Sequence, residues 1–132
     1  MKIIKTANFI IMDNKRNVLL IKRALNQKEP NLWSLPGGTK EDNETLEQCL
    51  TREINEELNT SIKKYRFFQS YTVKSDNKIV VASYYTGSIN DLIKLNKQES
   101  SDYRWFAQKN IPDNLAYNQN KVLSDFFDSI FY

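Results

Sequence analysis

Histidine is absent from the 132-residue chain, cysteine occurs once and glycine only three times. Without histidine, acid and base chemistry must come from carboxylates, lysine, tyrosine or metal-bound water. Because Cys49 is the only thiol, the chain can form neither an internal disulfide nor a structural zinc site of cysteines and histidines. Cys49 itself is expected in the core.

Long hydrophobic runs are also missing. The longest, residues 9–12 and 18–21, fall far short of the roughly 20 residues that span a bilayer, so we expect no membrane insertion. Lys5, Thr6 and Asn8 interrupt the apolar start that a secretory signal would need, and we expect a cytoplasmic protein. The length fits one domain, residues 1–132, and the 40% hydrophobic fraction supplies a core.

The order of apolar and turn residues predicts an α/β domain with a mixed β-sheet and two principal helices. We expect a hairpin of strands 2–12 and 17–23 around the turn 13–16, and a second hairpin of strands 62–73 and 78–87 around 75–77. Short strands are expected at 32–35 and 103–106. Helical spacing predicts a C-terminal helix that packs on the sheet through Val122, Leu123, Phe126, Phe127, Ile130 and Phe131.

A further helix is predicted in the middle of the chain. Thr45 and Gln48 have the spacing of a capping box, which indicates a helix start. The helix should run to about Leu58, where Asn59 can end it in the left-handed conformation. Its apolar side would bury Leu46, Cys49, Leu50 and Ile54.

Charge is distributed unevenly, although the net charge is only +3. Residues 41–57 carry a net charge of −6, whereas the rest of the chain carries +9. A solvated acidic helix is one interpretation. The other is that cations bind to this segment and that the basic surroundings favour an anionic substrate.

Three of these acidic residues share one helix face. Glu53, Glu56 and Glu57 stand at positions i, i+3 and i+4, so their carboxylates project close together. Gly37 and Gly38 precede the helix and allow the backbone to approach a ligand closely. Clustered carboxylates with a loop carbonyl form the oxygen-rich site that Mg²⁺ or Mn²⁺ prefers.

The same segment carries a recognisable pattern. From Gly38 the chain reads glycine, five residues, Glu44, seven residues, then Arg52-Glu53-Ile54-Asn55-Glu56-Glu57. This pattern resembles the Nudix box of the MutT-like pyrophosphohydrolases. Asn59 and Thr60 stand where that box normally ends with a glycine and an aliphatic residue, which leaves the acidic positions intact.

The resemblance implies the Nudix α/β/α sandwich and a hydrolase of nucleoside diphosphates linked to another group. It implies that Mg²⁺ or Mn²⁺ is held by Glu53, Glu56, Glu57 and the Gly38 carbonyl. By the same resemblance, Glu44 and Arg52 would fix the loop against the helix. The general base would be Glu53, Glu56 or Glu99; Glu99 resembles a late carboxylate of some relatives, and otherwise is an ordinary exposed loop residue.

Substrate contacts are open to two interpretations each. Arg23 can steer a phosphate or be a solvated strand-end arginine, and Asn118 can read a nucleobase edge or cap the last helix. Gly37 is a third expected substrate contact, because the backbone of a glycine can approach the substrate closely. Trp33 can stack on a base, although half-buried packing explains it more simply.

The substrate follows only by elimination. The chain lacks the proline and tyrosine that, after the box, mark ADP-ribose and dinucleoside polyphosphate hydrolases. We therefore expect a nucleoside or deoxynucleoside triphosphate, oxidised or not, cleaved to monophosphate and pyrophosphate by a monomer or homodimer. The alternatives are RNA 5′-end decapping, nucleotide-sugar or dinucleoside-polyphosphate hydrolysis, and a non-catalytic nucleotide-binding module. Because the lysines are scattered, long nucleic acid is not the expected partner.

Overall fold

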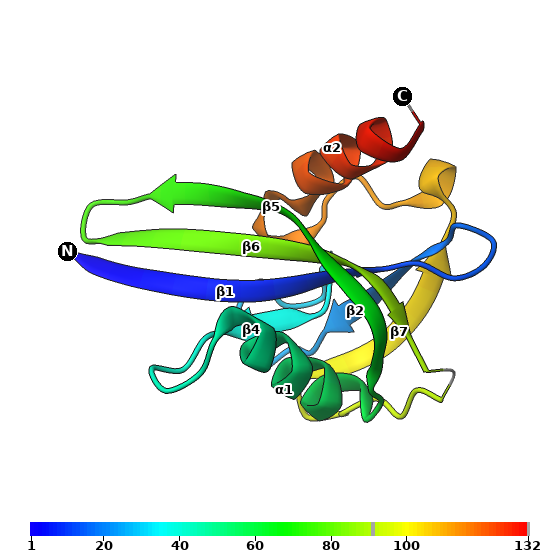
Figure 1. Ribbon diagram of the computed structural model, residues 1–132, viewed down its shortest axis with the longest axis horizontal. Coiled ribbons are helices and arrows are strands. Elements are labelled where there is room, and N and C mark those ends of the chain that lie inside the picture. Colours follow the sequence, from blue (N-terminus) through cyan, green and yellow to red (C-terminus); the bar gives the residue numbers. More distant parts are fainter. Residues whose placement is uncertain (91, 132) are drawn as a thin grey trace.

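Strands dominate the first and middle parts of the chain, and a helix ends it (Figure 1). A computed structural model describes residues 1–90 and 92–131. The strands are β1 (Lys2–Ile11), β2 (Val18–Arg23), β3 (Trp33–Ser34), β4 (Gly37–Thr39), β5 (Ile62–Lys74), β6 (Lys78–Ile89) and β7 (Ser100–Phe106). The helices are α1 (Leu46–Leu58) and α2 (Gln119–Phe131), with 3-10 turns η1 (Gln108–Asn110) and η2 (Ala116–Asn118).

The strands form two sheets. The four-stranded sheet has the order β4-β1-β6-β5 and is mixed, because β1 and β6 run parallel while its other pairs are antiparallel. The three-stranded sheet, β3-β2-β7, is antiparallel. The predicted hairpin of β5 and β6 is confirmed.

The predicted hairpin of β1 and β2 is wrong. Its turn forms, since the Asp13 carboxylate accepts hydrogen bonds from the backbone of Lys15 and Asn17, but only a single bridge, Met12 to Val18, joins the two segments. Both edges of β1 are occupied by β4 and β6, so β2 pairs with β3 and β7 instead. Local turn chemistry predicted the reversal of the chain but not the partner of each strand.

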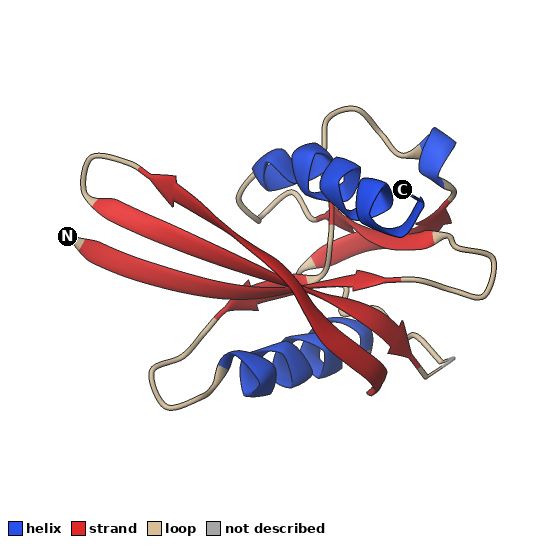
Figure 2. Ribbon diagram, turned by 45° about the horizontal axis from the view of Figure 1, so that its top comes forward, coloured by secondary structure: helices blue, strands red, loops and turns tan. Residues whose placement is uncertain are grey.

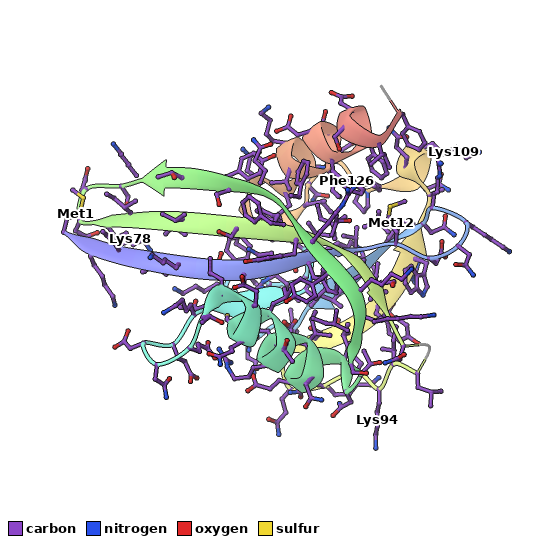
Figure 3. All side chains as sticks on the ribbon, viewed as in Figure 1. Met1, Met12, Lys78, Lys94, Lys109 and Phe126 are labelled. Atoms are coloured by element: carbon purple, nitrogen blue, oxygen red, sulfur yellow. The ribbon has the colours of Figure 1, made fainter. Side chains whose placement is uncertain are left out.

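The two helices cover opposite faces of the sheets, as Figure 2 shows. Because side chains alternate along a strand, odd-numbered residues of β1 and β2 such as Phe9 and Leu19 pack on the α1 side. Even-numbered residues such as Ile10 and Leu20 pack on the α2 side. There they meet Phe126, whose side chain extends from α2 toward the sheets (Figure 3). The result is the predicted α/β/α sandwich, with a core on each side.

Helix α1 forms where its end signals predicted. The Thr45 side chain accepts a hydrogen bond from the Gln48 amide at 3.1 Å, and the Gln48 side chain accepts one from the Thr45 amide at 2.8 Å. Asn59 ends the helix in the left-handed conformation with φ of 50°. Cys49, Leu50 and Ile54 are fully buried, while Leu46 is partly buried.

Helix α2 packs through most of the predicted apolar stripe. Val122, Leu123, Phe126 and Phe127 are buried, whereas Phe131 is exposed. The first residue, Gln119, is polar yet buried, because its side chain accepts a hydrogen bond from the Leu35 amide at 2.8 Å and donates one to the Tyr84 hydroxyl. Neither helix, in the part of the chain described, has the length and apolarity that crossing a bilayer requires.

The capping box of α1 can be tested directly. Thr45→Ala should lower the free energy of unfolding by about 1 kcal/mol, because the side-chain acceptor for the Gln48 amide is lost. Urea denaturation measures this change. Thr51→Ala is the matched control, since Thr51 is exposed within the same helix and bonds only to the Glu47 carbonyl. An equal decrease in the free energy of unfolding in the two variants would contradict the capping role of Thr45.

Candidate active site

The Gly37-Gly38 pair lies in β4, between β1 and helix α1. A Cβ atom on Gly37 would lie 2.4 Å from the Ala7 carbonyl oxygen, and one on Gly38 would lie 2.3 Å from the Glu53 carboxyl carbon. At Gly37 the clash would be with backbone, so only glycine fits, whereas at Gly38 a side chain would displace the Glu53 carboxylate. The sequence correctly indicated a close approach of the backbone, but the groups approached here belong to the protein itself.

Glu57 is the buried member of the acidic face, with an exposed fraction of 5%. Its Oε1 accepts a hydrogen bond from the Gly37 amide at 2.9 Å. Burial, followed by the charge of Glu53, raises the pKa of Glu57 well above its ordinary value. The Gly37 amide is thus engaged by Glu57, and a substrate contact through the Gly37 backbone stays a prediction.

Arg52 joins the acidic face to the preceding loop. Its Nη2 and Nε donate to the two carboxylate oxygens of Glu44 at 2.6 and 3.0 Å, and Nη2 also donates to the Thr39 carbonyl at 3.1 Å. This bidentate pair lowers the pKa of Glu44 to about 2. Glu44 also accepts from the Glu41 amide, so Glu44 and Arg52 act as positioning residues that fasten loop 39–44 to α1.

The remaining nitrogen of Arg52, Nη1, lies near three further glutamates, of which Glu41 is the most distant at 3.9 Å. It donates to Glu53 Oε1 at 2.8 Å and lies 3.3 Å from Glu56 Oε2. The Glu53 side chain is 14% exposed, whereas that of Glu56 is 49% exposed. Burial raises the pKa of Glu53, and the neighbouring charges of Glu56 and Glu99 raise it further against the opposing effect of Arg52.

Glu99 reaches the site from the segment that joins β6 to β7. The Asn96 amide donates to the Glu57 carbonyl at 2.9 Å, and the Glu99 amide donates to the Asn96 carbonyl, so this segment is attached to the end of α1. The charge of Glu99 contributes to the raised pKa of both Glu53 and Glu57. The structure thus brings Glu99, half-buried, beside the box carboxylates.

Arg23 contacts Tyr117, the residue before Asn118, at another side of the site. The positive charge of Arg23 opposes the rise in the pKa of Glu57, and its guanidinium lies 5.0 Å from the centre of the Tyr117 ring. Asn118 follows Tyr117 and is exposed, directly before the first residue of α2. Trp33 packs edge-on against Phe106 at 5.2 Å, as the simpler interpretation expected.

Sequence reasoning missed several groups that build this site. Tyr117 has no neighbouring motif to single it out, and its left-handed backbone with φ of 56° appears only in the fold. The Thr39 carbonyl and the Asn96 amide take part through the backbone, which residue identity does not reveal. Four non-glycine residues with positive φ, namely Glu29, Asn31, Tyr117 and Asn118, belong to the two segments around Arg23.

The acidic face fits a hard divalent cation by its chemistry, since every donor is oxygen and burial has raised the pKa of Glu53 and Glu57. Within residues 1–90 and 92–131, no three acidic, cysteine or histidine side chains already converge on one point. Arg52 holds Glu53 and Glu56, while Gly37 holds Glu57. Binding an ion therefore requires side-chain rotation within a positioned set.

Comparison with known proteins identifies the family. The NUDIX domain model matches residues 2–126, and the chain therefore belongs to the Nudix hydrolases. An 8-oxo-dGTP diphosphatase of Proteus vulgaris is 30% identical over 76 residues, which cover 58% of this chain and 68% of that protein. The NAD-capped RNA hydrolase NudC of Vibrio atlanticus (strain LGP32) is 27% identical over 106 residues, covering 79% of this chain and 38% of NudC.

A solved structure confirms the fold. The crystal structure of the MutT protein from Methanosarcina mazei Go1 is similar with a TM-score of 0.87 and 22% identity, covering 99% of this chain and 97% of that one. The predicted Nudix-type sandwich, with its mixed sheet and two helices, is thereby confirmed. The enzyme class predicted from the box, a Nudix hydrolase, is confirmed by the family match.

The burial of Glu57 predicts how stability depends on pH. Because the folded pKa of Glu57 is raised above the ordinary 4.5, the folded state binds more protons than the unfolded state at higher pH, and stability falls as pH rises through this window. In chelator at about pH 8, Glu57→Gln should therefore be more stable than the wild type. The amide keeps an oxygen that can accept from Gly37.

Thermal denaturation at several pH values measures this difference. The gain should shrink at about pH 4, where the wild-type carboxyl is protonated in both states. Glu47→Gln is the control. Glu47 is exposed in the first turn of α1, where a negative charge is favourable, so this variant should not be more stable than the wild type at high pH. A Glu57→Gln variant less stable than the wild type at high pH would refute this account.

Proposed function

We propose that the protein hydrolyses nucleoside or deoxynucleoside triphosphates, oxidised forms included, to a monophosphate and pyrophosphate, with Mg²⁺ or Mn²⁺ as cofactor. One observation supports this above all. The carboxylates of Glu53 and Glu57 lie against the Gly37-Gly38 pair of β4, with Glu99 close by and Arg52 fastening the loop. Acidic groups are gathered here at an electrostatic cost that a cation relieves.

In this proposal Glu53, Glu56, Glu57 and the Gly38 carbonyl hold the ion. When bound, the divalent ion neutralises the diphosphate and lowers the pKa of the attacking water. The Gly38 carbonyl already accepts a weak hydrogen bond from the Cys49 thiol at 3.6 Å, which orients its oxygen near the acidic face. Arg52 keeps Glu53 and Glu56 on the loop side of α1.

The base that takes a proton from water is Glu53 in this proposal. Its pKa is raised by burial, so it accepts a proton more readily than an ordinary glutamate. Glu56 is half exposed and Glu99 lies on the joining segment, and these carboxylates are the remaining candidates for the same role. Arg52 holds the Glu53 carboxylate in place at 2.8 Å.

A triphosphate substrate is supported by the groups around the acidic face. Arg23 supplies a positive charge beside Glu57, suitable for a phosphate, and Asn118 offers an exposed amide that can read a nucleobase edge. The Proteus vulgaris relative bears the name 8-oxo-dGTP diphosphatase. We extend that substrate class to this chain, and a cytoplasmic location would give access to the nucleotide pool.

A second function rests on the NudC relative, whose name is NAD-capped RNA hydrolase. This chain spans well under half of the length of that relative. Cleavage at a capped or phosphorylated RNA 5′ end would use the same carboxylates, with a different binding site for the nucleobase. We rank it second because the lysines are scattered along the chain and form no continuous basic track for a nucleic-acid backbone.

A substrate panel tests the proposal. The purified protein with Mg²⁺ is given ordinary and oxidised dNTPs, NTPs, ADP-ribose, a dinucleoside polyphosphate, a nucleotide sugar and 5′-capped RNA, and products are separated by ion-exchange chromatography. We expect a triphosphate to be preferred, with monophosphate and pyrophosphate as products and no turnover in chelator. Preference for the capped RNA would establish the second function instead.

Matched variants connect turnover with the site. Glu53→Gln should lower kcat on the order of a hundredfold or more, because the amide accepts no proton and binds a cation poorly. Glu47→Gln on the exposed side of the same helix should leave kcat within about twofold. Similar kcat values for Glu53→Gln and the wild type would overturn the assignment of the base and the metal site together.

A further inference from the structure

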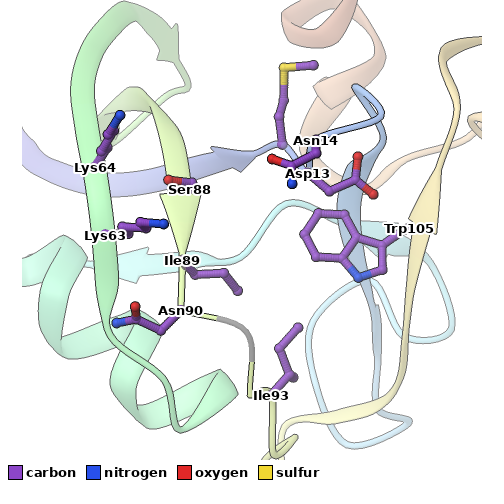
Figure 4. A pocket seen from close by; sticks show the side chains of 10 residues that line it. Asp13, Asn14, Lys63, Lys64, Ser88, Ile89, Asn90, Ile93 and Trp105 are labelled. Carbon is purple, nitrogen blue, oxygen red and sulfur yellow. The ribbon is translucent and has the colours of Figure 1, made fainter.

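A cavity lies away from the acidic face. It has a volume of about 510 Å³ and lies on the α1 side between β5, β6 and β7 (Figure 4). In the β2–β7 ladder, Ser100 pairs with Arg23 at the catalytic end, whereas Trp105 pairs with Leu19 and lines the cavity. Five residues of strand separate these ends by about 17 Å.

An irregularity in β5 gives the cavity its charge. Lys63 and Lys64 are adjacent, so in a regular strand their side chains would point to opposite faces. The pairing of β5 with β6 shifts between Ile62 and Lys64, and this bulge allows both lysines to line the cavity. Gly87 accommodates the bulge, because a Cβ there would collide with the Lys64 carbonyl oxygen.

Neither lysine is paired with a carboxylate in the part of the chain that the structure describes. Asp13 also lines the cavity, but its two oxygens accept hydrogen bonds from the Lys15 amide and from the amide and side chain of Asn17. The lysine end of the cavity is therefore suited to an anion.

The opposite wall is aromatic. Trp105 is 36% exposed, and Figure 4 shows its indole across the cavity from Lys63 and Ser88. Ile89 and Ile93 provide apolar surface between them, and the Asn14 side chain offers an amide at the rim. An aromatic plane opposite the Lys63 ammonium group, with Lys64 also lining the cavity, is an arrangement suited to a base at one end and a phosphate at the other.

We propose that this cavity binds a free mononucleotide, with the phosphate at Lys63 and Lys64 and the base against Trp105. The volume lies in the range of small-ligand pockets. The site is distinct from the catalytic carboxylates, since none of its lining residues belongs to the acidic face, to Arg23 or to the segment around Tyr117. The proposal goes beyond the proposed function and does not depend on turnover.

The two tryptophan indole groups give a direct readout. In ¹H–¹⁵N spectra recorded in chelator, the peak absent from Trp105→Phe belongs to Trp105, and the other belongs to Trp33. Titration with AMP or GMP should shift the Trp105 peak in a saturable way. The Lys63→Ala/Lys64→Ala double variant should weaken this binding by about tenfold, because two charge-assisted contacts to the phosphate are removed.

The control removes the same charge from the other end of the same hairpin. Lys74 and Lys78 do not line the cavity, and Lys78 lies at the far end of the sheet from Met12, a lining residue (Figure 3). Lys74→Ala/Lys78→Ala should change the affinity by less than about twofold. Unshifted peaks elsewhere in each variant verify that the fold is intact.

Three results would overturn the proposal. One is a Trp105 peak that stays in place up to millimolar nucleotide. Another is an equal loss of affinity in both double variants, which would indicate general charge attraction. The last is an identical saturable shift with inorganic phosphate or only with an oligonucleotide, which would assign the site to an anion alone or to a nucleic acid.

Discussion

Two carboxylates on one turn of α1, those of Glu53 and Glu57, are largely removed from water, and neighbouring groups compensate for this burial. The Gly37 amide donates a hydrogen bond to the Glu57 carboxylate, and Nη1 of Arg52 donates one to the Glu53 carboxylate. Neither contact cancels the burial, since the pKa of each carboxyl is still raised. The local structure therefore carries an unrelieved preference for positive charge, which is the physical basis of the proposed metal site.

The contacts of Arg52 with its acidic neighbours differ in length and in exposure to solvent. Its two-nitrogen contact with Glu44 is short and lowers the pKa of that carboxyl to about 2, so this pair is a permanent structural connection. Its contact with Glu56 is longer and more exposed. One guanidinium thus fastens the loop through Nε and Nη2, while its contact with Glu56 is longer and half exposed.

The division into two sheets explains why the chain can carry both this site and a separate cavity. Strand β1 is enclosed by β4 and β6, and the Gly37-Gly38 pair of β4 lies between β1 and α1. Strand β7 belongs to the other sheet and runs from the catalytic end, at Ser100, to the cavity, at Trp105. The two ends of one strand therefore lie at two different surfaces of the molecule.

The sequence by itself determined the elements whose signals are local: the capped helix α1 with its acidic face, the β5–β6 hairpin, the apolar stripe of α2 and the Nudix box. These follow from spacing within a few residues, which side-chain geometry converts directly into structure. Tertiary structure alone decided that β1 and β2 part into different sheets, that the Gly37 amide faces Glu57, that Glu99 and Tyr117 reach the site, and that Lys63 and Trp105 share a cavity. Each of these depends on pairing between distant segments, because a strand's partner is chosen by competition for its edges and not by its own residues.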